Sequence, residues 1–100
     1  MNIDKLDEIG QTSIDLFGNP TNPLPSLHHL QEEVKEVMKE PLDVTEYADC
    51  LILLMGAFKR IGGTAEQLVQ AAIDKVEVNK KRKWGKADEN GVIKHIDEEI

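Results

Sequence analysis

The sequence predicts an all-α protein in which four helices form a bundle. Three observations support this prediction. Apolar residues recur at helical spacing in four segments, capping residues precede several of these segments, and the connections between them are short and contain Gly or Pro. Short connections between amphipathic helices are typical of an antiparallel bundle.

The first helix is expected from Ile3 to about Phe17. One broad apolar stripe runs along it and comprises Ile3, Leu6, Ile9, Leu16 and Phe17. The stretch GNPTNPLPS that follows holds three prolines and one glycine, which is typical of a loop. Ser26 closes this stretch and is a suitable N-cap for the next helix.

The second helix is expected from this cap to about Lys39. Its apolar positions at helical spacing are Leu27, Leu30, Val34, Val37 and Met38. Pro41 ends the helix, because proline disfavours the helical region for the residue before it.

The third helix is expected to begin at DVTE, where Asp43 is the N-cap and Glu46 follows three residues later. It runs to RIGG and is apolar around its whole circumference, so it is either central in the fold or shared with a partner chain. The fourth helix follows a capping box from Thr64 to Gln67 and runs to about Lys83. Its inward positions are Ala65, Leu68, Val69, Ala72 and Val76.

Length and composition indicate a single domain, with a helical part over residues 1–85 and an acidic, loop-like tail over residues 86–100. With 100 residues and 40% apolar content the core is modest, which favours association into a homo-oligomer. A net charge of −7 argues against nucleic acid or an anionic membrane surface as the main partner. One cysteine, no signal-peptide pattern and no stretch approaching the ~20 apolar residues of a membrane span predict a soluble cytoplasmic protein.

Acidic residues gather on one side of the second helix. At 100° per residue, His29, Glu33, Glu36 and Glu40 fall within an arc of about 60° beside the apolar stripe. Glu33 and Glu36 are three residues apart, so their carboxylates can meet at one point, and Glu32 lies just around the helix. The same spacing recurs on the third helix.

There the pair is Glu46 and Asp49, one turn before the fully apolar interior. Two such pairs facing each other would form a four-carboxylate cage. Two like charges about 4 Å apart repel by roughly 4 kcal/mol at an effective dielectric of about 20, and a hard divalent cation such as Mg²⁺ or Mn²⁺ cancels this repulsion. A di-iron site is disfavoured, because neither pair contains the Glu-x-x-His pattern.

A purely structural interpretation is also open for each residue taken singly. Glu46 would be a capping partner, Asp49 a first-turn acid that interacts with the helix dipole, and the second-helix glutamates a solvated face. Two acidic pairs ten residues apart, the second entering an apolar helix, favour the cation.

These segments resemble a known family. EEVKE and EYAD resemble the EExxE…ExxD signature of the MazG-like all-α nucleoside triphosphate pyrophosphohydrolases, a superfamily that includes dimeric dUTPases and dCTP pyrophosphatases. DKVEVNKKRKW is similar to the K-x-x-x-N-x-x-R-x-aromatic motif on their last helix. With LHHLQEEV and VIKHI, the resemblance covers roughly residues 24 to 96 and is closest to a phage and bacterial subgroup that acts on dATP and dGTP. Gly85 departs from the pattern, since relatives often have Pro there.

The resemblance implies a MazG-like bundle that acts as a homodimer or homotetramer. It implies that two or three Mg²⁺ or Mn²⁺ ions bind to Glu33, Glu36, Glu46 and Asp49. Glu32 is the expected residue to hold or deprotonate the attacking water, with Glu33 also in the catalytic set. The implied reaction converts a nucleoside triphosphate and water to the monophosphate and pyrophosphate.

Purine deoxynucleotides, dGTP or dATP, are the first expectation for the substrate. The alternatives are dCTP, dUTP or a damaged nucleotide, or a catalytically silent helical interaction module. If a phage encodes the chain, the host cytoplasm is its expected location.

The fourth helix contributes expected substrate contacts. Lys75, Asn79 and Arg82 fall within about 60° of one another and could hold the β- and γ-phosphates. Lys75 and Arg82 are equally explained as last-turn cations, whereas Asn79 is not. Trp84 is expected against the base, or as a packing residue, and His29 as a substrate or outer-shell contact. Asp74 and His95 receive no role from the sequence.

Overall fold

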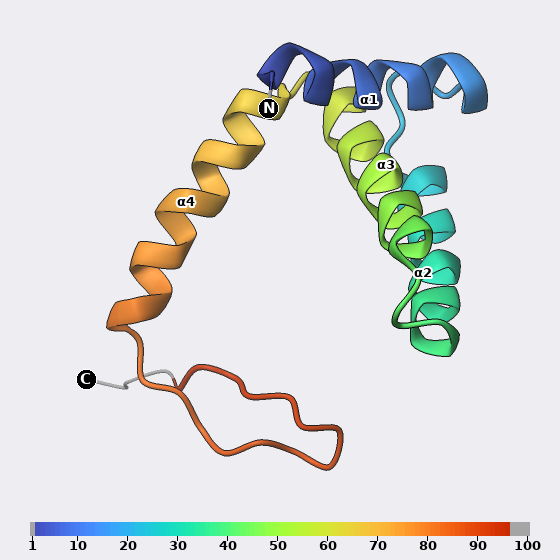
Figure 1. Cartoon of the computed structure of the whole chain (residues 1–100). Helices are drawn as coiled ribbons and strands as arrows, with labels where there is room; N and C mark the ends of the chain where they lie inside the picture. Colours follow the sequence, from blue (N-terminus) through green and yellow to red (C-terminus); the bar gives the residue numbers. More distant parts are fainter. Residues whose placement is uncertain (1, 97–100) are drawn as a thin grey trace. The chain divides into compact units, whose positions relative to one another are not determined.

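The computed structural model describes residues 2–96 and contains four α-helices in chain order (Figure 1). They are α1 (Ile3–Phe17), α2 (Leu24–Lys39), α3 (Val44–Arg60) and α4 (Ala65–Lys81). The described residues contain no β-strand, so the all-α prediction is confirmed. The chain divides into two compact units, Met1–Val69 and Gln70–Ile100.

In the first unit α3 is the central helix and packs against both α1 and α2. α2 and α3 lie side by side, joined by the short turn at residues 40–43, while α1 crosses the C-terminal part of α3 (Figure 1). The most buried apolar side chains are Leu53, Met55 and Ala57 of α3, together with Ala65. The buried residues of α3 thus lie in the C-terminal half of the helix, where it has the packing of a central helix.

Two glycines allow α1 and α3 to approach each other closely. A Cβ atom at Gly56 would lie 2.2 Å from Ser13 Oγ, and one at Gly10 would lie 2.9 Å from the carbonyl oxygen of Met55. Ser13 has no exposed surface at all. The absence of a side chain on both glycines is therefore what sets the distance between the two helices.

Arg60 ends α3 and, at 5% exposure, is a buried cation. Its guanidinium donates to the carbonyl oxygens of Gly18, Asn19 and Ser13 at 2.9–3.2 Å, and Nη1 donates to Ser13 Oγ at 3.2 Å. A cation near the C-terminal end of a helix also interacts favourably with the helix dipole. Arg60 thus joins the end of α1, and the turn that follows it, to the end of α3.

The predicted caps of α3 and α4 are confirmed. Asp43 Oδ1 accepts a hydrogen bond from the backbone N–H of Thr45 at 2.9 Å. Thr64 and Gln67 form a reciprocal capping box, with distances of 3.0 and 3.2 Å. α4 ends at Lys81, two residues before the predicted end at Lys83.

The prediction that Ser26 caps α2 is wrong. The helix begins at Leu24, whose backbone N–H donates to Asn22 Oδ1 at 3.1 Å. Ser26 lies inside the first turn, where its buried hydroxyl donates to the carbonyl oxygen of Leu53 at 2.9 Å. The Ser26 hydroxyl therefore joins α2 to α3 instead of starting α2.

The apolar stripe of α1 has the predicted bounds, but it is only partly buried. Leu6 and Ile9 are half-buried, whereas Leu16 is 70% exposed. Further large apolar side chains are exposed on α2 and α3, namely Leu24, Val34, Met38, Val44, Leu51 and Leu54. This is a large amount of exposed apolar surface for a chain of this length.

The second unit contains most of α4 and a returning segment. Trp84 and His95 form an isolated antiparallel bridge, and their rings meet edge to face at 6.1 Å. The segment after α4 loops back on itself (Figure 1). Within this loop the Gly91 N–H donates to the Asp88 carbonyl at 2.9 Å. Of the predicted acidic tail, residues 86–96 form this hydrogen-bonded return, and residues 97–100 lie outside the described residues.

Candidate metal centre

Three carboxylates from two helices converge in the first unit. Glu33 of α2 and Glu46 and Asp49 of α3 each offer an oxygen, and these oxygens all lie within 4.8 Å of one another. The i, i+3 spacing brings Glu46 and Asp49 to the same side of α3. The short turn between the helices brings that side against Glu33. Tyr47 holds this turn, because its hydroxyl donates to the carbonyl oxygen of Pro41 at 2.9 Å.

The cluster lies at the edge of the apolar interior. Glu33 and Glu46 are half-buried and Asp49 is exposed, so one side of the group is open to solvent. Burial raises the pKa of Glu46, and the negative charges of Asp43, Asp49, Glu33 and Glu36 raise it further. The charged form of Glu46 is therefore disfavoured, and a bound cation would offset the repulsion from its acidic neighbours.

Glu36 and Glu32, the two other acids predicted for the site, lie outside this group of three. Glu36 is exposed, and its carboxylate lies 3.5 Å from Lys39 Nζ. Its charge nevertheless raises the pKa of Glu46, so it is close enough for its charge to act on the cluster. Glu32 is exposed on α2.

His29 lies one turn before Glu33 on α2. Its Nε2 is 3.3 Å from Glu33 Oε1, and its ring meets the ring of Phe17 edge to face, with centroids 5.8 Å apart. His29 also lines a cavity of about 110 Å³ with Phe17, Ser26, Leu53 and Arg60 among the other lining residues. The contact between Phe17 and His29 was not predicted, because the apolar pattern of α1 does not show which other helix Phe17 packs against.

Cys50 directly follows Asp49 and is half-buried. Burial raises the pKa of its thiol, and the charges of Glu33, Asp49 and Glu46 raise it further. The thiol is therefore kept protonated, and a thiolate ligand is disfavoured. The donors on offer are carboxylate oxygens, which is the chemistry that Mg²⁺ and Mn²⁺ prefer.

The other predicted substrate contacts belong to the second unit. Arg82 Nη1 donates to Asn79 Oδ1 at 3.3 Å, and Trp84 Nε1 donates to the Asn79 carbonyl at 2.9 Å. These bonds group three of the predicted residues at the end of α4. Lys75 is exposed two turns earlier, and Asp74 accepts a hydrogen bond from Gln70 at 2.9 Å.

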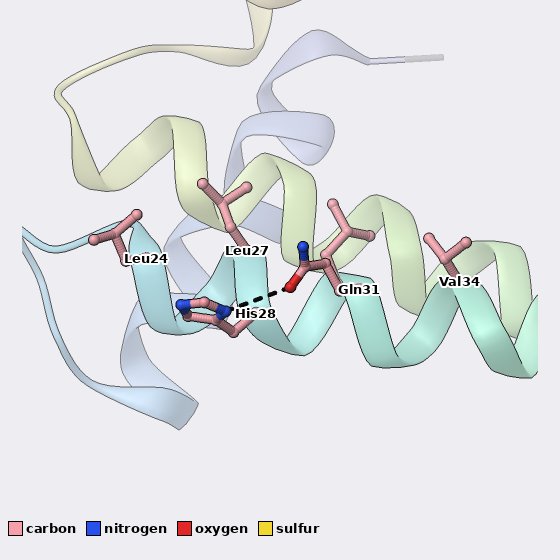
Figure 2. A pocket seen from close by; sticks show the side chains of 6 residues that line it. Leu24, Leu27, His28, Gln31 and Val34 are labelled. Atoms are coloured by element: carbon pink, nitrogen blue, oxygen red, sulfur yellow. Dashed lines mark hydrogen bonds between the residues drawn. The ribbon is translucent and has the colours of Figure 1, made fainter.

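A groove of about 440 Å³ runs along α2 (Figure 2). Its lining residues all come from that helix and are Leu24, Leu27, His28, Leu30, Gln31 and Val34. By the 100° spacing of a helix, the centre of this face lies on the opposite side of α2 from His29 and Glu33. A second apolar cavity of about 230 Å³ shares Leu27 and continues over the end of α3, where Leu54, Phe58 and the C-cap residue Ile61 line it.

A family model and a solved structure both match the chain to pyrophosphohydrolases. The model of the dATP/dGTP pyrophosphohydrolase family matches residues 5–100. A MazG-like pyrophosphohydrolase of cyanophage S-2L, solved with dGDP and three catalytic Mn²⁺ ions per active site, is 28% identical, with a TM-score of 0.75. That match covers 97% of this chain and 99% of the cyanophage chain.

A second relative is the Eaa protein of Salmonella phage P22, which is 37% identical over 60 residues. The match covers 60% of this chain but only 19% of the Eaa protein, so the chain spans about a fifth of that curated relative.

Among the described residues, no helix has the length and apolar character needed to cross a membrane.

Proposed function

The chain belongs to the dATP/dGTP pyrophosphohydrolase family, and we propose that it hydrolyses a purine deoxynucleoside triphosphate at the α2–α3 carboxylate cluster. Water attacks the α-phosphorus, the bond to the β-phosphate oxygen breaks, and the products are the monophosphate and pyrophosphate. The observation that carries this proposal is the convergence of Glu33, Glu46 and Asp49 within 4.8 Å.

The three carboxylates fit a hard divalent cation. Mg²⁺ prefers carboxylate oxygens and is small, so its ligands must come close together. Glu33, Glu46 and Asp49 would hold it, because their oxygens already lie within 4.8 Å of one another and their side chains can rotate closer. Bound ions would neutralise the triphosphate oxygens and lower the pKa of a bound water.

Glu36 would be the fourth carboxylate of a site with two or three ions, because its charge already acts on Glu46. Its present partner Lys39 is 71% exposed, and ion pairs at such positions contribute at most about 1 kcal/mol. Turning Glu36 from Lys39 toward the cluster therefore costs little. The three Mn²⁺ ions of the cyanophage relative support a site with more than one ion.

The remaining roles are assigned by residue type. Glu32, exposed beside the cluster, would accept the proton of the attacking water, and Glu33 would share in holding that water. Lys75, Asn79 and Arg82 would contact the β- and γ-phosphates, and no protein nucleophile is needed. Trp84 offers an aromatic face that is 45% exposed, suitable for stacking on a base.

The exposed apolar grooves on α2 and α3 support assembly of the chain as a homodimer or homotetramer. Together they expose large aliphatic side chains that water solvates poorly, including Leu24, Val34 and Leu54. A second copy has the same surface to offer, as an isologous interface requires. Because two phage proteins are among the relatives, the proposed location is the cytoplasm of an infected bacterium.

The choice of purine rests on the family description and on the dGDP bound to the cyanophage relative. The test is a pyrophosphate-release assay over all common ribo- and deoxynucleoside triphosphates with Mg²⁺ or Mn²⁺. Faster release from dGTP or dATP than from dCTP or dUTP supports the proposal. Preference for a pyrimidine would keep the chemistry but change the substrate. No release from any nucleotide, together with no thermal stabilisation by Mg²⁺, would favour a silent interaction module instead.

A further inference from the structure

We propose that His29 is a positioning residue, which holds the Glu33 carboxylate in the orientation that metal binding requires and is itself held by Phe17. This inference rests on the proposed function, because it takes Glu33 as a metal ligand. It concerns the structure around the ligand and not the reacting atoms.

The geometry places His29 beside the ligand set and outside it. His29 Nε2 lies 3.3 Å from Glu33 Oε1, yet the converging donor atoms are those of Glu33, Glu46 and Asp49. A ring nitrogen that contacts Oε1 limits rotation of the carboxylate group, so that Oε2 also has a defined direction. Ligating carboxylates commonly depend on such outer partners, and loss of one typically reduces metal affinity about 10- to 100-fold.

The imidazole is in turn oriented from a different helix. Phe17, near the end of α1, meets the His29 ring edge to face at an interplanar angle of 75°. The end of α1 is fixed by Arg60, which donates hydrogen bonds to the carbonyls of Gly18 and Asn19. A continuous set of contacts therefore runs from the end of α3, through Phe17 and His29, to Glu33.

A simpler interpretation is an ordinary i, i+4 pair on a helix surface, which adds a few tenths of a kcal/mol to helix stability. The two interpretations differ in what a substitution changes. An ordinary pair affects only stability, whereas a positioning residue affects the affinity for the metal. Glu33, at 21% side-chain exposure, is also more enclosed than a typical surface partner.

The test is calorimetric titration of Mn²⁺ into the purified full-length protein, with no nucleotide present. H29A is expected to weaken Mn²⁺ binding at least tenfold. H29Q, whose amide nitrogen can occupy the position of Nε2, is expected to bind within about threefold of the native protein. F17L, which leaves the sequence of α2 unchanged, is expected to weaken Mn²⁺ binding by a smaller factor than H29A does. His28, which lies on the groove side of α2, provides the matched control, and H28A should bind Mn²⁺ as the native protein does.

Equal Mn²⁺ affinity for H29A and the native protein would overturn the inference, and so would an H29Q protein as weak as H29A. Should H29A fail to fold, the H29Q and F17L titrations still decide the question. Failure of the proposed function gives a different result, because the native protein itself would then bind no Mn²⁺ or release no pyrophosphate.

Discussion

The carboxylate of Asp7, on α1, accepts a hydrogen bond from the backbone N–H of Ala65 at 2.9 Å and thereby caps the first turn of α4. Its other oxygen lies 2.8 Å from Lys59 Nζ, near the end of α3. One side chain therefore links three helices. The hydrogen bond from Lys59 lowers the pKa of Asp7 most, and the one from Ala65 lowers it further.

Stability should consequently depend on Asp7 in a defined pH range. Because its pKa is lower in the folded state, its contribution is fully present above the unfolded value of about 4 and is lost as the pH falls through the folded pKa. D7N keeps an acceptor for Ala65 but lacks the charge, so it should be less stable than the native protein at pH 7, and the difference should shrink in acid. Urea unfolding at several pH values measures this.

Asp15 is an exposed aspartate on the same helix and provides the control. The D15N protein should unfold much as the native protein does at every pH. A difference between D7N and the native protein that is independent of pH would contradict the assignment.

Arg60 should be among the least replaceable residues of the first unit. R60M removes the donor from the carbonyls of Gly18 and Asn19 and from both oxygens of the buried Ser13, and a buried group that loses its partner costs about 1–3 kcal/mol. We expect a total loss of about 3 kcal/mol in the free energy of unfolding, measured by chemical denaturation. K5M, at an exposed lysine on α1, should change it by less than about 0.5 kcal/mol. An R60M protein as stable as K5M would show that the carbonyls find other partners.

The close crossing of α1 and α3 can be tested with one methyl group. In G56A the new Cβ would meet Ser13 Oγ at 2.2 Å, and α1 would have to move away, at a cost of about 1–3 kcal/mol. Gly85 is the matched control, because a Cβ there meets its nearest atom at 3.4 Å, which is ordinary contact. G85A should retain the native melting temperature. Equal melting temperatures for G56A and G85A would mean that the helices are not in close contact.

The sequence predicted local features well, because their causes are local. The caps at Asp43 and Thr64 depend on residues two or three positions away, and both were predicted. The convergence of Glu46 and Asp49 follows from their i, i+3 spacing, and their approach to Glu33 follows from a short turn. These features need no knowledge of distant contacts.

Features that depend on partners distant in the sequence could not be predicted from the sequence. Arg60 looks like an ordinary last-turn cation until its acceptors, more than 40 residues away, are known. Serine is a common N-cap residue, but the Ser26 hydroxyl donates a hydrogen bond to the Leu53 carbonyl on the neighbouring helix. Whether Glu36 faces the cluster or Lys39 depends on a side-chain rotamer, which spacing does not determine.

Glu46 should reverse its effect on stability when a metal is added. Its raised pKa means that its charge lowers stability once the pH rises above the unfolded value, so E46Q without metal should be at least as stable as the native protein at pH 7. With Mn²⁺ the order should invert, because only the native protein retains the full ligand set. Thermal melts with EDTA and with Mn²⁺ measure both states. A native protein that gains no more from Mn²⁺ than E46Q does would exclude Glu46 as a ligand.

The central claim is that the α2–α3 cluster supports pyrophosphohydrolysis with divalent ions. Phosphorus NMR of the products from dGTP and Mn²⁺, with the native protein and D49N compared at equal helicity by circular dichroism, tests it most directly. The account predicts equal amounts of dGMP and pyrophosphate from the native protein and no turnover by D49N. Release of orthophosphate with dGDP, or near-native turnover by D49N, would contradict it.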